Sequence, residues 1–111
     1  MMFVVVNTIR VKPGMGEAFA ERFREPKGIQ SMPGFVRMEF QRTVNPQEAD
    51  YEEFKVCTTW ESKEHFEAWT RSDSFRQAHE QRKTSGSGEM MLGAKLSMHE
   101  VLFTHLADSQ K

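Results

Sequence analysis

The sequence predicts a single α+β domain in which strands and helical segments follow one another in the order β-α-β-β-α-β. Three observations support this prediction. Several stretches alternate apolar and polar residues at strand spacing, others carry apolar residues at helical spacing, and proline, glycine, serine and asparagine separate them. The chain has 111 residues, which is the length of one domain with one core.

The first half of the chain contains two predicted strands and one helix. Residues 2–11 are rich in β-branched side chains, and residues 35–44 alternate in character, so both are predicted strands. Between them, apolar residues such as Phe19 and Phe23 recur every four positions, which predicts a helix over residues 16–25. Proline and glycine residues flank this helix on both sides.

The second half of the chain contains two more predicted strands, with two predicted helices between them. Residues 54–60 form the third predicted strand, and residues 96–104 form the fourth. Two helices are predicted between them, over residues 63–70 and 74–82. Each follows residues that commonly cap helices, with Ser62 as the candidate for the first.

This order of elements is the split β-α-β, ferredoxin-like arrangement, with an antiparallel sheet and both helical regions on one face. Residues 1–111 are expected to form one domain that ends in a polar tail over about residues 105–111. The uncovered sheet face needs a partner, so we expect a homodimer packed sheet to sheet, a dimeric α+β barrel. A chain this short is not expected to enclose a large cavity without walls from a second copy.

Composition narrows the classes of function. The net charge of −1 argues against nucleic acid or an anionic membrane as a partner. Cys57 is the only cysteine and no secretory signal or membrane-spanning run is present, so a cytoplasmic location is expected. Cys57 lies out of phase with its strand's apolar residues and is expected to be unreactive. The sequence contains none of the GxSxG, P-loop and GxGxxG motifs.

Asn7 is a candidate site residue because it shares the phase of apolar residues in the first strand. An amide on an apolar face costs roughly 1–3 kcal/mol unless it is hydrogen-bonded. Two interpretations stay open from the sequence: a structural amide satisfied by backbone, or an amide that faces a ligand pocket.

His79 and Trp69 are the other two candidates. His79 lies on the apolar side of the second helical piece, where it is either a structural residue or a metal ligand. The other histidines are too scattered for a multi-ligand zinc site, but one histidine suffices when haem supplies four nitrogens. Trp69 is either a core residue or part of the same cavity, since a break near Ser72 and Asp73 would let both side chains point together.

These residues resemble the IsdG-type haem-degrading monooxygenases of the antibiotic-biosynthesis-monooxygenase-like superfamily. The family carries a T-x-W-x-S pattern, which here includes Trp60 and Ser62, then a helical tryptophan and an S-x-x-F-x-x-A-H segment matched by Ser72 to His79. It also carries an asparagine near the seventh position and a P-G-F motif, matched here by residues 33–35. The resemblance covers most of the chain, from Phe3 to about Phe103.

The resemblance implies a role for each residue. His79 would be the axial ligand of haem iron, Trp69 would distort the porphyrin from the other side, and Asn7 would orient oxygen. Haem would be both cofactor and substrate, opened by O2 with electrons from a reductase or ascorbate, and iron would be released, which suits iron acquisition. The remaining cofactor-binding residues that we expect are Phe23, Phe66, Phe75 and Arg22.

The two haem propionates need cations. Besides Arg22, the candidates are Arg24, Lys27, Arg82 and Lys83. Residues 84–92 are glycine-rich and are a candidate lid over the haem edge.

Three alternatives remain open at this level. A cofactor-free monooxygenase of the same fold, acting on a quinol or another aromatic, would not need a coordinating histidine at position 79. A haem carrier or sensor would keep His79 without degrading the ring. A structural dimer would bind no ligand.

Overall fold

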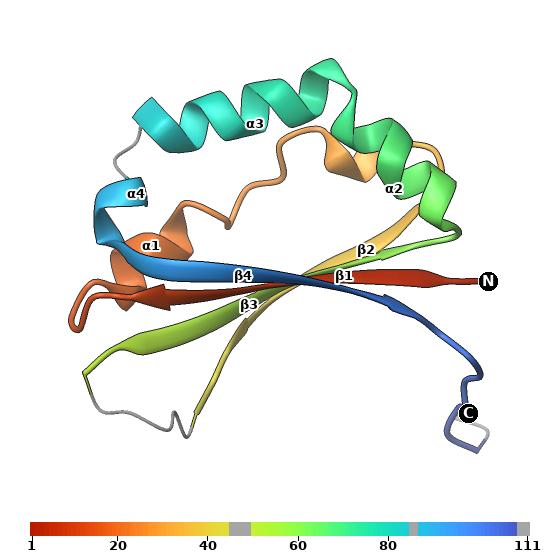
Figure 1. Cartoon of the computed structure of the whole chain (residues 1–111), viewed down its shortest axis with the longest axis horizontal. Helices are drawn as coiled ribbons and strands as arrows, with labels where there is room; N and C mark the ends of the chain where they lie inside the picture. The colour runs from red at the N-terminus through yellow and green to blue at the C-terminus, as the bar shows by residue number, and fades with distance from the viewer. Residues whose placement is uncertain (45–49, 85–86, 109–111) are drawn as a thin grey trace.

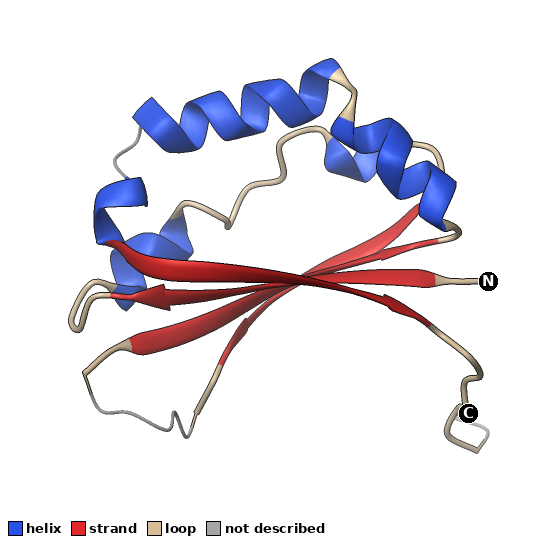
Figure 2. Ribbon diagram, in the orientation of Figure 1, coloured by secondary structure: helices blue, strands red, loops and turns tan. Residues whose placement is uncertain are grey.

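Four strands form one antiparallel sheet in the order β2-β3-β1-β4, and the helices cover one of its faces (Figures 1 and 2). The structure is a computed structural model that describes residues 1–44, 50–84 and 87–108, without the side chains of residues 81–84 and 87. The strands are β1 Phe3–Val11, β2 Phe35–Arg42, β3 Glu52–Trp60 and β4 Met91–Glu100. The helices are α1 Gly16–Glu21, α2 Lys63–Thr70, α3 Asp73–Thr84 and α4 Ser87–Met90, with a 3₁₀ turn at Ile29–Ser31. The predicted ferredoxin-like fold class, an antiparallel sheet with helices on one face, is confirmed, and the dimeric barrel stays a prediction.

Helix α1 and strand β4 differ most from the prediction; β1, β2, β3 and α3 differ by one or two residues at their ends, and α4 was not predicted. Helix α1 ends at Glu21 because the following residues make tighter hydrogen bonds, such as Phe23 N–H to the carbonyl of Ala20, and then reach Pro26. The fourth strand occupies residues 91–100 instead of 96–104. It pairs with β1 along its whole length, from Glu100 opposite Phe3 to Met91 opposite Val11, so β1 decides where β4 begins and ends.

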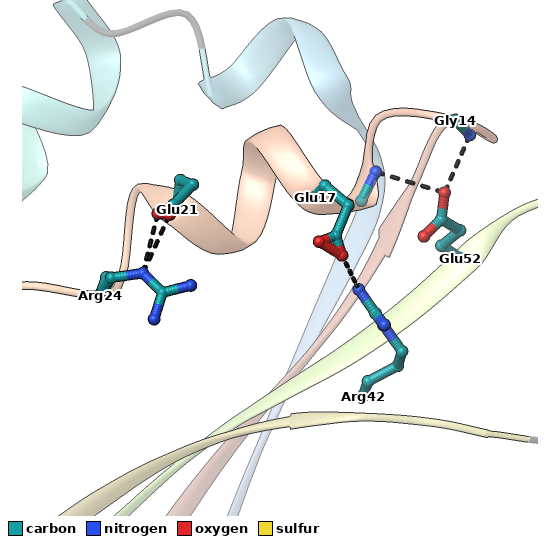
Figure 3. A network of polar contacts seen from close by, with 7 residues as sticks. Gly14, Glu17, Glu21, Arg24, Arg42 and Glu52 are labelled. Carbon is teal, nitrogen blue, oxygen red and sulfur yellow. Dashed lines mark hydrogen bonds and ion pairs between the residues drawn. The ribbon is translucent and has the colours of Figure 1, made fainter.

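Polar contacts hold α1 against the ends of β2 and β3 (Figure 3). The carboxylate of Glu52 accepts hydrogen bonds from the backbone N–H groups of Gly14, at 2.8 Å, and Gly16, at 3.2 Å. Arg42 donates to Glu17 at 2.9 Å. A Cβ atom at Gly16 would overlap the Glu52 side chain, so this close approach requires glycine. These contacts fix α1, and with it Phe19, over one end of the sheet.

The apolar core is divided into two clusters at opposite ends of β1. The α2 cluster consists of buried Phe3, Val5, Ile29 and Trp60, packed against Met32, Phe35, Phe66 and Trp69. The α1 cluster consists of buried Ile9, Val11, Phe19 and Phe54, packed against Phe23, Phe40, Val56, Met90 and Met91. Asn7 is the helix-facing residue of β1 between the two clusters. The core is therefore interrupted at the position where the strand carries its amide.

The face of the sheet opposite the helices is uncovered (Figure 2). Val4 and Val6 lie at its centre, and the sheet register places Cys57 and Ser97 on either side of Val6. Beyond the end of β4 the chain leaves the sheet with three strongly exposed apolar side chains, Leu102, Phe103 and Leu106. No helix in the described part of the chain is long and apolar enough to span a membrane.

Candidate functional site

A cavity of about 620 Å³ opens between the two clusters, on the helix-covered face of the sheet. Its walls come from β1, β3 and β4 below and from α1, α2 and α3 above. The side chains and glycine that line it are Val5, Asn7, Ile9, Phe19, Phe23, Val56, Thr58, Phe66, Trp69, Thr70, Phe75, His79, Gly88, Met91, Ala94 and Leu96. The cavity is partly open to solvent, so it does not contradict the expectation that one copy would enclose no large cavity; it forms because the core is split and not continuous.

Asn7 lies in the sheet wall of this cavity. None of the described residues makes a hydrogen bond to its side-chain amide, although the neighbouring helix-facing residues Val5 and Ile9 are buried at 5% and 3% exposure. An amide that the protein leaves without a partner in an apolar setting is available to a ligand. The structure therefore favours the pocket interpretation of Asn7 over the structural one.

Trp69 forms part of the helical wall. Its ring lies 5.6 Å from that of Trp60 and 4.8 Å from that of Phe75, the latter in an edge-to-face contact. The indole Nε1 of Trp69 is buried and has no hydrogen-bond partner among the described residues. Trp69 thus belongs to the α2 cluster on one side and faces the cavity on the other.

His79 faces the cavity from α3 and its ring orientation is fixed. Nδ1 lies 3.0 Å from the backbone carbonyl oxygen of Phe75, and a carbonyl can only accept, so Nδ1 carries the proton. In a neutral imidazole with this tautomer, the lone pair is on Nε2. Histidines that bind metals in proteins usually donate their other ring N–H to such a carbonyl. The Phe75 ring supports the imidazole at a centroid distance of 4.0 Å.

The break between α2 and α3 brings Trp69 and His79 to one cavity. Ser72 donates its hydroxyl to the carbonyl of Trp69 at 2.6 Å and accepts the N–H of Phe75 at 3.1 Å. It therefore closes one helix and caps the next. On one continuous helix the two side chains would point roughly 80° apart.

The aromatic residues expected to bind the cofactor, Phe23, Phe66 and Phe75, all line the cavity. Arg22 does not line it, but its Nε is buried without a hydrogen-bond partner in the described part of the chain. Of the other expected cations, Arg24 is exposed and paired with Glu21 at 2.8 Å (Figure 3), and Lys27 is exposed. The side chains of Arg82 and Lys83 lie outside the described residues, as do residues 85–86 of the candidate lid.

Thr58 is a cavity residue that the sequence analysis did not select. It is 6% exposed and lies on the helix-facing side of β3, in phase with Phe54 and Trp60. Like Asn7, Thr58 is a polar residue at an apolar phase of a strand. Threonine is common in strands, so this signal is weaker than that of an amide.

Cys57 points away from the cavity, onto the uncovered face. Burial and the charge of Glu39 raise the pKa of its thiol above the ordinary value, and Lys55 opposes this only in part. Because a reactive cysteine needs a lowered pKa, Cys57 fits an inert role. Among the described residues, no group of three or more histidine, cysteine, aspartate and glutamate side chains forms a metal site.

The sheet topology, the split core and the cavity agree with the sequence match to one protein family. The model of the antibiotic biosynthesis monooxygenase family matches residues 2–81, and the chain belongs to this family. A heme oxygenase (staphylobilin-producing) of Staphylococcus haemolyticus is 38% identical over 104 residues, covering 93% of this chain and 98% of that protein. A heme-degrading monooxygenase of Bacillus cereus is 35% identical over 100 residues, covering 90% of each.

Solved structures show the same fold. A monooxygenase of this family from Bacillus cereus superposes with a TM-score of 0.79 at 22% identity, over 99% of this chain and 100% of that one. The heme-degrader MhuD from Mycobacterium tuberculosis superposes with a TM-score of 0.64 at 26% identity, over 93% of this chain and 98% of that one. The MhuD structure holds two hemes in its active site.

Proposed function

We propose that this protein is a haem-degrading monooxygenase that binds haem as both cofactor and substrate in the cavity between the two clusters. One observation carries the proposal. His79 presents Nε2, the ring nitrogen that is not bonded to Phe75, to the same apolar cavity that Asn7 lines with an amide that has no partner among the described residues. The relatives named for haem degradation, which match nine-tenths or more of this chain, agree with it.

The cavity has the chemistry that haem needs. Its lining is aromatic and aliphatic apart from Asn7, Thr58, Thr70 and His79, which suits a flat apolar ring. When bound, haem supplies a redox-active iron and the ring that is to be oxidised by O2. His79 would hold that iron through Nε2, since an imidazole nitrogen is a good ligand and the ring is oriented by its bond to the Phe75 carbonyl.

Asn7 and Trp69 would control the reaction from opposite walls. The Asn7 amide is a neutral donor, so it would orient oxygen by a hydrogen bond without delivering an acidic proton. The rings of Trp60 and Phe75 pack against the ring of Trp69. Trp69 would therefore resist displacement and press on a bound ring. Holding a bound ring in one position against Asn7 would be a proximity effect. The apolar walls, including Phe23 and Phe66, would exclude water.

Arg22 is the cation that we assign to a propionate. Its buried Nε lacks a partner in the described part of the chain, and it is adjacent in sequence to Phe23 of the cavity wall. A carboxylate would satisfy that N–H with a charge-assisted hydrogen bond. The electrons would come from an external donor, a reductase in the cell or ascorbate in the test tube.

We propose that the protein works as a homodimer. The uncovered sheet face has Val4 and Val6 at its centre, and the exposed Leu102, Phe103 and Leu106 follow β4. Packing two such faces together would bury both sets of apolar residues. Sedimentation should give a dimer, and Val6→Glu should give a monomer because two charges would be buried together. A wild-type monomer at micromolar concentration would contradict the proposal.

A haem titration tests the main proposal. The purified protein should form a saturable Soret complex, and ascorbate or a reductase in air should bleach it and release iron. His79→Ala should lose the spectrum of histidine coordination, whereas His105→Ala, outside the cavity, should retain it. Absence of a Soret complex would favour a cofactor-free oxygenase of the same fold. A complex that survives reduction in air would indicate a haem carrier.

A further inference from the structure

We propose that the hydroxyl of Thr58 is a second hydrogen-bond donor to the ligand, held in place by the indole of Trp60. This inference rests on the proposed haem function and concerns a residue in the sheet wall of the same cavity. Thr58 is 6% exposed, Trp60 is fully buried, and both lie on the helix-facing side of β3.

The hydrogen bond between these two side chains fixes the direction of the hydroxyl. Trp60 Nε1 donates to Thr58 Oγ1 at 3.1 Å, and the indole has no capacity to accept in return. The hydroxyl proton of Thr58 must therefore point away from Trp60. The Thr58 hydroxyl makes no other hydrogen bond with the described residues, although Thr58 is almost completely buried.

Thr58 lines the cavity, so the cavity is a direction in which its hydroxyl proton can find a partner. The β1–β3 register sets Val56 opposite Asn7 and Thr58 opposite Val5, so Asn7 and Thr58 are diagonal neighbours on one face. Such neighbours have backbones about 7–8 Å apart, which lets both side chains approach one small ligand between them. Both groups are neutral donors.

Thr70 provides an internal comparison. It also lines the cavity, but its hydroxyl donates to the carbonyl of Glu67 at 2.6 Å. Its proton is already used by the protein, whereas the proton of Thr58 is not. The two threonines are the same residue type, but only Thr58 keeps a hydroxyl proton that no described residue accepts.

The arrangement also gives a physical reason for the spacing of threonine and tryptophan in β3. Residues two apart in a strand lie on the same face, so the indole of Trp60 reaches the hydroxyl of Thr58 without a turn. Since the β-branched side chain of threonine has few χ1 rotamers, the hydrogen bond from Trp60 restricts where its oxygen lies and keeps the hydroxyl proton away from the indole.

Carbon monoxide bound to the ferrous haem complex is the probe, because its C–O stretching frequency responds to nearby hydrogen-bond donors. Thr58→Val should raise this frequency, and Thr58→Ser, which keeps the hydroxyl, should restore it. Trp60→Phe should broaden or raise the band because it frees the hydroxyl. Thr70→Val is the matched control and should leave the band at its wild-type position. The rate of O2 dissociation should rise about two- to tenfold in Thr58→Val.

The outcomes separate this inference from the proposed function. A wild-type protein that forms no Soret complex overturns both. A normal Soret complex whose C–O band is the same in wild type, Thr58→Val and Thr58→Ser overturns only the role of Thr58. If Thr58→Val does not fold, the comparison of wild type with Trp60→Phe and Thr58→Cys decides, because both should shift the band.

Discussion

Along β1, the two apolar clusters consist of buried side chains, whereas the gap between them is an open cavity. In β1, Phe3 and Val5 at one end and Ile9 and Val11 at the other are buried and surrounded by apolar side chains. Asn7, between them, faces a cavity and has no partner among the described residues. The clusters are filled and carry the stability, whereas the gap is kept open and carries one amide, Asn7, at the cost of some stability.

This contrast explains how a small domain holds a cavity of about 620 Å³. Each cluster has its own helical cover, α2 for one and α1 with α4 for the other (Figure 1). The long α3 spans the space between them. A single continuous core in a chain of 111 residues would leave no such space. The division of the core into two clusters and a cavity predicts which substitutions change the free energy of unfolding and which change haem binding or turnover.

The largest loss of stability is expected from Trp60→Ala. Trp60 is fully buried in the α2 cluster and contacts the rings of Phe35, Phe66 and Trp69. Its truncation should lower the free energy of unfolding by about 3–5 kcal/mol, which is a large part of the total for a domain of this size. Urea unfolding followed by circular dichroism measures it. A loss below about 1 kcal/mol would show that the cluster does not hold the fold.

Two opposite substitutions on β1, Val5→Asn and Asn7→Val, compare the α2 cluster with the cavity directly. Val5→Asn places an amide in the α2 cluster and should cost about 2–3 kcal/mol, because a polar group without a partner is buried. Asn7→Val, two residues away on the same face, should leave the stability unchanged or raise it by up to about 1 kcal/mol. Asn7→Val should nevertheless slow haem turnover while haem still binds. If both variants lost the same free energy of unfolding, the core would not be divided at Asn7.

A smaller effect tests whether the clusters are independent. Ile29→Val in the α2 cluster and Ile9→Val in the α1 cluster should each cost about 0.5–1.5 kcal/mol. Because the two residues belong to different clusters, the double variant should equal the sum within about 0.5 kcal/mol. Chemical denaturation of the four proteins gives the coupling energy. A coupling above about 1 kcal/mol would mean that the core behaves as one unit.

The smallest effect on stability is expected at His79, which is an exposed residue of the cavity wall. His79→Ala should change the free energy of unfolding of the haem-free protein by less than about 0.5 kcal/mol. The same variant should lose histidine coordination of iron and at least about tenfold in haem affinity. Thermal unfolding and a haem titration on one sample provide both values. A large destabilisation without loss of coordination would make His79 a structural residue.

The sequence predicted most of the fold because local signals agreed with one another. Ser62 accepts the N–H of His65 at 3.3 Å as the expected cap, and α2 spans the predicted residues 63–70. The position of β4 was wrong by several residues, since its ends depend on pairing with β1, which is a non-local interaction. The end of α1 was also too late, because the change to tighter turns after Glu21 leaves no clear mark in the sequence.

For the candidate site, the sequence by itself determined which residue types are unusual: an amide at an apolar phase of a strand, and a histidine and a tryptophan on apolar helix faces. Only the tertiary structure decided what they do together. It divides the core at Asn7, turns the chain at Ser72 so that Trp69 and His79 meet one cavity, and leaves the protons of Thr58 and Thr70 in different places. The reason is physical: periodicity records the face on which a side chain lies, whereas a cavity and a free hydrogen-bond donor arise only when elements distant in sequence pack together.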